Sequence, residues 1–188
     1  MSLRAIPGLT VIRPADANEA VEAWRLALLN DRGPTALVLT RQNLPVLDRS
    51  VCAPAAGLQR GGYVLWESGP GQPEAILIAT GSEVEIALAA GRTLAAEGVR
   101  IRVASLPSWE RFDREPQAWR DGVLPPAVRV RVAVEAGARL GWEHYVGLDG
   151  AVIGLDRFGA SAPSAVLYEK LGLTAEAVAT ATRRLLKK

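Results

Sequence analysis

The chain has 188 residues, of which 49% are hydrophobic and 22% are charged, and its formal net charge is +2. A single cysteine excludes an intramolecular disulfide, and one cysteine with one histidine cannot build the usual His/Cys zinc cages. Charges of both signs are interspersed, no apolar run approaches the ~18 residues that span a bilayer, and no signal peptide is visible. We therefore expect a cytoplasmic protein with neither a nucleic-acid nor a membrane partner.

The first elements predict a βαβ unit. β-Branched and apolar residues at 9–13 indicate a strand, and a helix is expected over residues 17–30. The continuous apolar run at 35–40 is typical of a strand buried on both faces of a parallel sheet. Two strands are only part of a sheet, so we expect this unit to be mobile, misdocked or shielded by another copy.

The helix expected over 17–30 has a start signal and an apolar face. Asp16 followed three residues later by Glu19 is the pattern of a capping box. Helical spacing places four apolar side chains together on the helix: Val21, Trp24, Ala27 and Leu28.

Residues 42–62 lose all periodicity and gain proline and glycine, so we predict a linker there. The segment at 69–73 is a short turn that would suit an antiparallel pair of flanking strands. Beyond the linker, strands are expected at 63–67, 75–80, 101–106, 128–135 and 151–154, and helices at 83–97, 116–119, 163–171 and 175–187.

This alternation predicts an α/β fold: a three-layer domain with a mostly parallel five-stranded mixed sheet, preceded by the partial βαβ unit. The first strand of that sheet is expected to be its antiparallel member. Helices should cover both faces of the sheet.

Arg41 is the most suggestive side chain, because it directly follows a predicted buried strand. Ligands of parallel α/β sheets gather beyond the carboxyl ends of the strands, and an arginine there can hold a phosphate or carboxylate with two parallel hydrogen bonds. The alternative is a solvated or salt-bridged arginine.

Two further strand ends carry polar groups. Residues 80–82 open a helix whose amides could hold an anion, but they lack the known phosphate-loop spacings, and Ser82 with Glu85 is explained by a capping box. Glu135 lies where catalytic acids occur, yet without a second carboxylate at a defined spacing a structural role is favoured.

The remaining candidates favour structural interpretations. His144 has no serine or cysteine motif beside it, and Cys52 has no group that would lower its pKa. Residues 158–163 contain a turn and a helix-starting proline, so helix initiation explains them. The five tryptophans are typical packing or interface groups.

Several strings, in order and covering almost the whole chain, resemble the C-terminal third of transketolases. They are Trp24 in its helix, Pro34–Ala36 through Thr40–Pro45, Arg60–Leu65, Ile78–Val84, Val134–Gly137, Tyr145–Gly150 and Phe158–Pro163.

The resemblance implies that residues 1–55 are the end of a thiamine diphosphate pyrimidine-binding domain plus linker, and that 60–188 are a transketolase C-terminal domain. It implies transfer of a two-carbon ketol unit between sugar phosphates in the pentose phosphate pathway by a homodimer. Thiamine diphosphate and a divalent metal, Mg or Ca, would serve the full enzyme. Of the family's functional positions only the substrate-phosphate arginine falls in this chain, at Arg41.

The family's catalytic, cofactor-binding and metal-binding residues have no counterpart here, so we expect the chain to be inactive alone and to contribute Arg41 and structural or dimer contacts. Related thiamine enzymes, the deoxyxylulose-phosphate synthases and ketoacid dehydrogenase β chains, are less favoured because their strand end does not usually read Arg-Gln-Asn. The sequence also leaves open a dimerisation or regulatory module, and a nucleotide-binding domain that uses residues 80–82.

Overall fold

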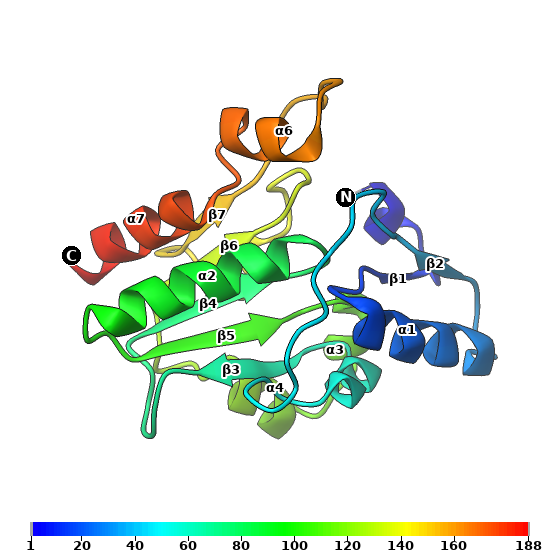
Figure 1. Ribbon diagram of the computed structural model, residues 1–188. Helices are drawn as coiled ribbons and strands as arrows, with labels where there is room; N and C mark the ends of the chain where they lie inside the picture. Colours follow the sequence, from blue (N-terminus) through cyan, green and yellow to red (C-terminus); the bar gives the residue numbers. More distant parts are fainter. Residues whose placement is uncertain (1, 188) are drawn as a thin grey trace.

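The computed structural model describes residues 2–187, and its centre is a five-stranded mixed sheet between two layers of helices (Figure 1). A smaller two-stranded sheet lies beside it. The strands are β1 (Thr10–Ile12), β2 (Thr35–Leu37), β3 (Tyr63–Glu67), β4 (Ala75–Ala79), β5 (Ile101–Ser105), β6 (Arg131–Val134) and β7 (Ala151–Ile153).

The longer helices agree with the predicted ranges to within one residue at most ends, whereas several short helices were not expected. The α-helices are α1 (Ala17–Leu29), α2 (Glu83–Ala96), α3 (Trp109–Phe112), α4 (Gln117–Val123), α5 (Glu143–Val146), α6 (Ser164–Lys170) and α7 (Ala175–Leu186), with 3-10 helices η1 (Ser2–Ala5) and η2 (Ala55–Arg60).

The large sheet has the strand order β3-β5-β4-β6-β7, and only the β3–β5 pair is antiparallel. The predicted mixed sheet with an antiparallel first strand is therefore confirmed. The expected pairing of β3 with β4 is wrong. Every residue of β4 is buried and both its edges are occupied by parallel partners, whereas β3, with its half-exposed alternation, suits the edge of the sheet.

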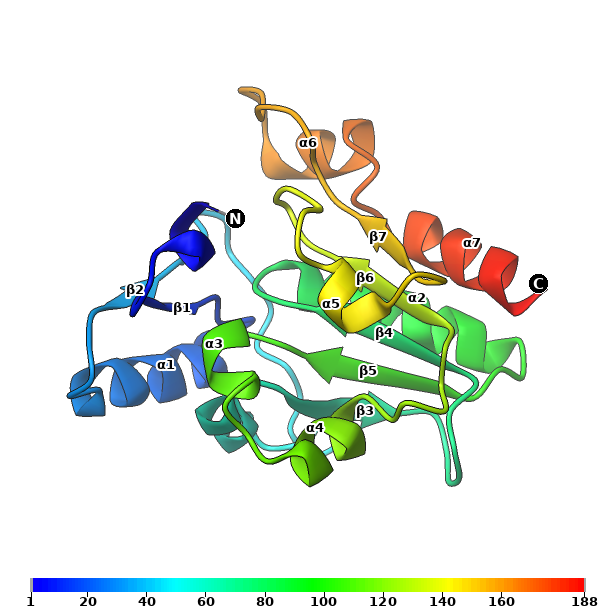
Figure 2. The same ribbon diagram turned by 180° about the vertical axis from the view of Figure 1, so that it is seen from behind.

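The two faces of the sheet have separate cores. Helices α2 and α7 cover one face and the short helices α3, α4 and α5 cover the other, as the opposite views in Figures 1 and 2 show. Side chains of β4 alternate between them: Leu77 joins the core under α2 and α7, while Ile76 and Ile78 join the core that contains Trp142.

The N-terminal part is the predicted βαβ unit. Strands β1 and β2 are parallel, with Thr10 opposite Thr35, and α1 connects them. β2 ends at Leu37, earlier than the predicted residue 40, although the Val38 amide still donates to Ile12 O at 2.9 Å.

The unit packs against the large sheet through the segment predicted as a linker. Leu58 of η2 is fully buried in a cluster with Ile12, Ala23 and Leu26, and Cys52 is buried in the core under α2. The segment therefore has no long regular element, but Cys52 and Leu58 anchor its second half in the cores. The expectation that this unit is mobile, misdocked or shielded by another copy stays a prediction.

Helix α1 buries a different face from the predicted apolar one. Its buried residues are Glu19, Ala23 and Leu26, whereas Val21 and Leu28 are 67% and 79% exposed. The cause is polar: the Glu19 carboxylate accepts hydrogen bonds from the Tyr63 hydroxyl at 2.7 Å and the Ser105 hydroxyl at 2.8 Å, which fixes the rotation of the helix.

The central position of β4 gives a stability prediction. Replacing Leu77, which is fully buried, with alanine should lower the free energy of unfolding by about 2–5 kcal/mol, because apolar contacts are lost and a cavity remains. Urea unfolding at pH 7 measures the change. Leu148→Ala is the control, since Leu148 is 100% exposed and its removal should change stability by less than about 0.5 kcal/mol. Equal effects of both variants would contradict the assignment of β4 to the core.

Candidate functional site

Arg41 lies in the loop that follows β2, and its side chain is exposed. Its neighbours make the local contacts: the Thr40 hydroxyl bonds to the Gln42 side chain, and Gln42 Nε2 donates to the Tyr168 hydroxyl at 3.2 Å. Within residues 2–187 the guanidinium of this exposed arginine has no hydrogen bond or ion pair.

Glu135, at the end of β6, is the centre of a buried group of charges. Its carboxylate accepts from Arg4 at 2.8 and 2.9 Å, from Arg13 at 2.8 Å and from the Trp142 indole at 2.8 Å. Burial alone would raise the pKa of this carboxyl, but the hydrogen bonds and positive charges of Arg4 and Arg13 outweigh it and hold the pKa below its usual value. Its carboxylate oxygens are engaged within the chain, so Glu135 has the structural role that the sequence favours.

Glu83, the first residue of α2, is the second acid of this group. Its Oε2 atom accepts from Arg13 at 3.0 Å and from the Ala136 amide at 3.0 Å, while Oε1 accepts from the Tyr168 hydroxyl at 2.6 Å. Glu83 is fully buried. Arg13 thus links two carboxylates from different strand ends, and these opposite charges raise its pKa although burial acts the other way.

The start of α2 does not have the predicted capping box. The Ser82 side chain caps no backbone amide of the helix and instead donates to the Glu83 carboxylate at 2.7 Å. Gly81, with φ +62°, lets Arg13 pass closely, because a Cβ there would lie 3.1 Å from the guanidinium carbon. The helix start is therefore occupied by the protein's own charges, which argues against an external anion on residues 80–82.

A second polar cluster joins α1 to the sheet. The Asp16 carboxylate caps α1 by accepting from the Glu19 amide at 2.8 Å, and both of its oxygens accept from Arg49 Nη2 at 2.9 Å. The predicted N-cap at Asp16 is confirmed, although Glu19 returns to the Ala15 amide at 2.8 Å instead of the amide of Asp16. Burial raises the pKa of Glu19, and the hydrogen bonds from Tyr63 and Ser105 oppose that shift.

Comparison with known proteins identifies the chain. The family model described as transketolase-like TK C-terminal domain matches residues 61–174, more than half of the chain, and the model described as transketolase, pyrimidine binding domain matches residues 1–46. The chain belongs to the transketolase family. The resemblance stated from the sequence is confirmed.

The similarity extends over the whole chain but over a minor part of the relatives. A transketolase of Geobacillus stearothermophilus is 52% identical over 100% of this chain and 28% of its own length. The solved transketolase of Leishmania mexicana is 40% identical to this chain, with a TM-score of 0.89. The match covers 99% of this chain and 26% of the Leishmania protein. A Pichia stipitis transketolase solved with sedoheptulose-7-phosphate has 34% identity and the same TM-score and coverage. The chain thus spans about a quarter of these transketolases.

The other positions considered from the sequence are His144, Cys52 and residues 158–163. His144 is exposed, and its Nε2 atom lies 3.5 Å from Asp113. Phe158 is exposed, and Pro163 is the N-cap residue of α6, so the transketolase string at 158–163 does precede a helix. Burial raises the pKa of the Cys52 thiol, which opposes a nucleophilic role.

Arg4 and Arg13 were not singled out from the sequence. Arg13 directly follows β1, whereas Arg41 lies four residues beyond Leu37, the last residue of β2, so the strand-end rule that selected Arg41 applies at least as well to Arg13. The two arginines differ in their surroundings: Arg13 is paired with buried carboxylates, and Arg41 is not. Only the fold distinguishes them, because the partners Glu83 and Glu135 are remote in the sequence.

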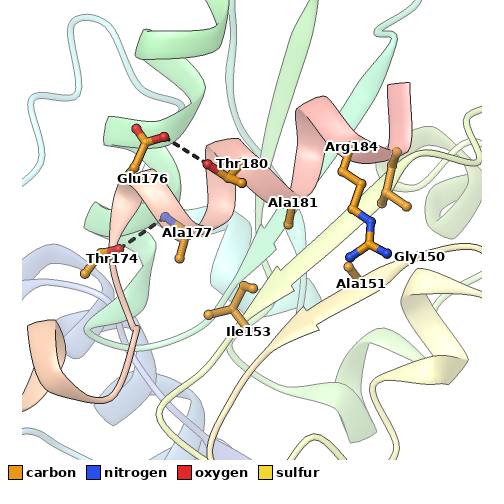
Figure 3. A pocket seen from close by; sticks show the side chains of 10 residues that line it. Gly150, Ala151, Ile153, Thr174, Glu176, Ala177, Thr180, Ala181 and Arg184 are labelled. Carbon is orange, nitrogen blue, oxygen red and sulfur yellow. Dashed lines mark hydrogen bonds between the residues drawn. The ribbon is translucent and has the colours of Figure 1, made fainter. Parts of the chain in front are cut away.

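A groove of about 630 Å³ lies between the edge strand β7 and α7 (Figure 3). Ile153 and Ala181 line its apolar part, and the Arg184 side chain extends over it towards Gly150 and Ala151. Neither the loop of Arg41 nor the buried charge group contributes to this groove, so we do not assign the transketolase site to it.

The described residues do not form a metal centre or a membrane segment. Across residues 2–187 no three His, Cys, Asp or Glu side chains gather as a metal-binding group would require. No helix in the same range is long and apolar enough to cross a bilayer.

The buried charges give a pH-dependent prediction. Glu135→Gln should lower the free energy of unfolding at pH 7 by about 3–5 kcal/mol, because Arg4 and Arg13 stay buried without a full counter-charge. The folded-state pKa of Glu135 is depressed, so its stabilisation is present above the unfolded value of about 4.3 and is lost as the pH falls through the folded value. Urea unfolding from pH 7 to pH 3 should therefore show the two proteins converging.

The matched control is Glu74→Gln. Glu74 pairs with Arg100 at 3.4 Å on the surface, and loss of an exposed pair should cost less than about 1 kcal/mol. A Glu135→Gln protein as stable as this control at pH 7 would contradict the structural importance of the buried group.

Proposed function

We propose that this chain contributes the C-terminal part of a transketolase that transfers a two-carbon ketol unit between sugar phosphates in the pentose phosphate pathway. Membership of the family supports the reaction, and the Pichia stipitis relative solved with sedoheptulose-7-phosphate supports a phosphorylated sugar as ligand. The observation that carries the proposal is the exposed Arg41 in the loop after β2, with no hydrogen bond or ion pair to its guanidinium among the described residues.

We also propose a division into two domains. Residues 1–55 are the end of the pyrimidine-binding domain with its linker, and residues 60–188 are the C-terminal domain. The matched ranges 1–46 and 61–174 and the separate two-stranded sheet support this division.

In the proposed function Arg41 holds the phosphate of the sugar. A guanidinium presents paired N–H donors to two phosphate oxygens, and it stays charged at any physiological pH. Arg13 cannot take this part because Glu83 and Glu135 already occupy its donors. Arg41 binds and orients the substrate and transfers no proton.

The residues described do not fit thiamine diphosphate or its divalent metal, Mg or Ca. They provide no cluster of metal ligands, and the start of α2, which lines the cavity beside Thr40 and Gln42, already holds the Glu83 carboxylate and Arg13. The cofactor and metal would be held by the remaining part of the enzyme, so the residues of this chain take no part in that chemistry. We further propose a cytoplasmic homodimer without nucleic-acid or membrane partners.

A hybrid enzyme tests the role of Arg41. The corresponding segment of the Geobacillus stearothermophilus transketolase, 52% identical, is replaced by this chain, and turnover is followed with xylulose and ribose phosphates. Arg41→Ala should raise the KM for these sugars about tenfold or more, since charge-assisted hydrogen bonds are lost, and should leave thiamine diphosphate affinity unchanged.

Arg32→Ala is the matched control, because Arg32 is an exposed arginine on the same unit. Unphosphorylated sugars provide a second control, since Arg41→Ala should hardly alter their KM. If Arg41→Ala and Arg32→Ala give the same KM for phosphorylated sugars, Arg41 is not the phosphate ligand.

The isolated chain should have no activity. With thiamine diphosphate, magnesium, and xylulose and ribose phosphates, we expect no sedoheptulose phosphate above background, because the chain supplies no site for the cofactor. Chromatographic analysis of the sugar phosphates measures this. Turnover that increases in proportion to the concentration of the chain would refute the proposed division of labour.

A further inference from the structure

The segment that carries Arg41 is held by few contacts. The Val38 amide donates to Ile12 O, and the Leu47 amide donates to Asp16 Oδ2 at 3.0 Å. For residues 39–46, between these two anchors, one hydrogen bond reaches the rest of the described chain, and it joins Gln42 Nε2 to the Tyr168 hydroxyl at 3.2 Å. Gln42 is the residue next to Arg41, so this hydrogen bond can restrict the backbone from which the Arg41 side chain extends.

The Tyr168 hydroxyl is itself fixed from the other side. It lies 2.6 Å from Glu83 Oε1, to which it donates, and 2.9 Å from the Ser82 hydroxyl. Burial and the nearby Glu83 charge raise the pKa of Tyr168 to about 12, so the hydroxyl keeps its proton at any physiological pH. Its oxygen is then free to accept the hydrogen bond from Gln42.

Glu83 is a rigid support for this hydroxyl. Its carboxylate is also bound by Arg13 and by the Ala136 amide, which come from the ends of β1 and β6. A fully buried carboxylate with both oxygens engaged has little freedom to move. Tyr168 therefore links Gln42 to groups that are fixed at the strand ends of the main sheet.

Packing does not fix the segment on this side. A cavity of about 250 Å³ lies between it and the C-terminal domain, with Thr40 and Gln42 on one wall and Ser82 and Tyr168 on the other. Since this space is not filled by side chains, the hydrogen bond from Gln42 to Tyr168 is what spans it.

We propose that Tyr168 is a positioning residue for Arg41: through Gln42 it holds the loop so that the guanidinium meets the phosphate of the sugar. The inference rests on the proposed function of Arg41. It gives the C-terminal domain a part in substrate binding, because Tyr168 belongs to α6 of that domain. Tyr168 itself touches no reacting atom.

A purely structural role for Tyr168 would have different consequences. If its hydroxyl served only to fasten α6 to α2, its removal would lower stability without altering the loop or the KM for phosphorylated sugars. The order of residues 40–43 and the comparison of phosphorylated with unphosphorylated substrates therefore separate the two roles.

The test uses Tyr168→Phe, which keeps the ring and removes the hydroxyl. In the chain itself, the backbone ¹⁵N order parameters of residues 40–43 should fall. In the hybrid enzyme, the KM for sugar phosphates should rise about fivefold, the effect of about one hydrogen bond, with kcat and the KM for unphosphorylated sugars unchanged. Tyr145→Phe is the matched control, since the Tyr145 hydroxyl also bonds a carboxylate, Asp113, but does not touch the loop.

Gln42→Ala removes the same contact from the loop, where Gln42 is half-buried and belongs to no helix or strand, so the fold should be retained. Gln42→Ala and Tyr168→Phe should have similar effects on the KM, and the double variant should be no worse than either single one. Additive effects, or unchanged order parameters in Tyr168→Phe, would overturn the proposal. A different result would show that the proposed function itself is wrong: Arg41→Ala would leave the KM for sugar phosphates unchanged, whatever the order parameters of residues 40–43.

Discussion

The bonds of Arg13 to Glu83 and Glu135 are the constraint on which the rest of the arrangement depends. Taking three charged groups out of water is costly, and the cost is offset only when each charge is paired and its remaining donors or acceptors are bound. Arg4, the Trp142 indole and the Ala136 amide complete the set. The small sheet is thereby tied to the ends of strands in the large one.

This constraint also separates two arginines that follow neighbouring parallel strands. The carboxylates bind Arg13 and make it part of the framework, while Arg41, in the loop after β2, is exposed, and we propose that it binds the sugar phosphate. Through Tyr168, Glu83 of this framework is linked by hydrogen bonds to Gln42, the residue next to Arg41. Binding sites gain precision when a flexible first contact is supported by a rigid second one.

Much of the fold follows from the sequence, because the apolar run of β4 and the alternation of strands with helices are local signals. Arg41 was selected as the candidate phosphate ligand from its place after a predicted strand together with the family strings. The pairing of β3 with β5 and the buried face of α1 were missed, since both depend on distant partners: Glu19 turns inward only because Tyr63 and Ser105 receive it. The hydrogen bond between Gln42 and Tyr168 could not be predicted, because the two residues are 126 positions apart in the sequence.

The separation between Arg4 and Glu135, 131 positions along the chain, also bears on the order of events during synthesis. Contacts between remote positions cannot form until both have been made, and closing so long a loop is slow compared with forming a helix. The segment that carries Arg4 therefore waits for more than a hundred residues to be made before Glu135 can bind it. Until β6 is in place, the arginines of this segment remain in water, and the two parts of the chain are free to move independently.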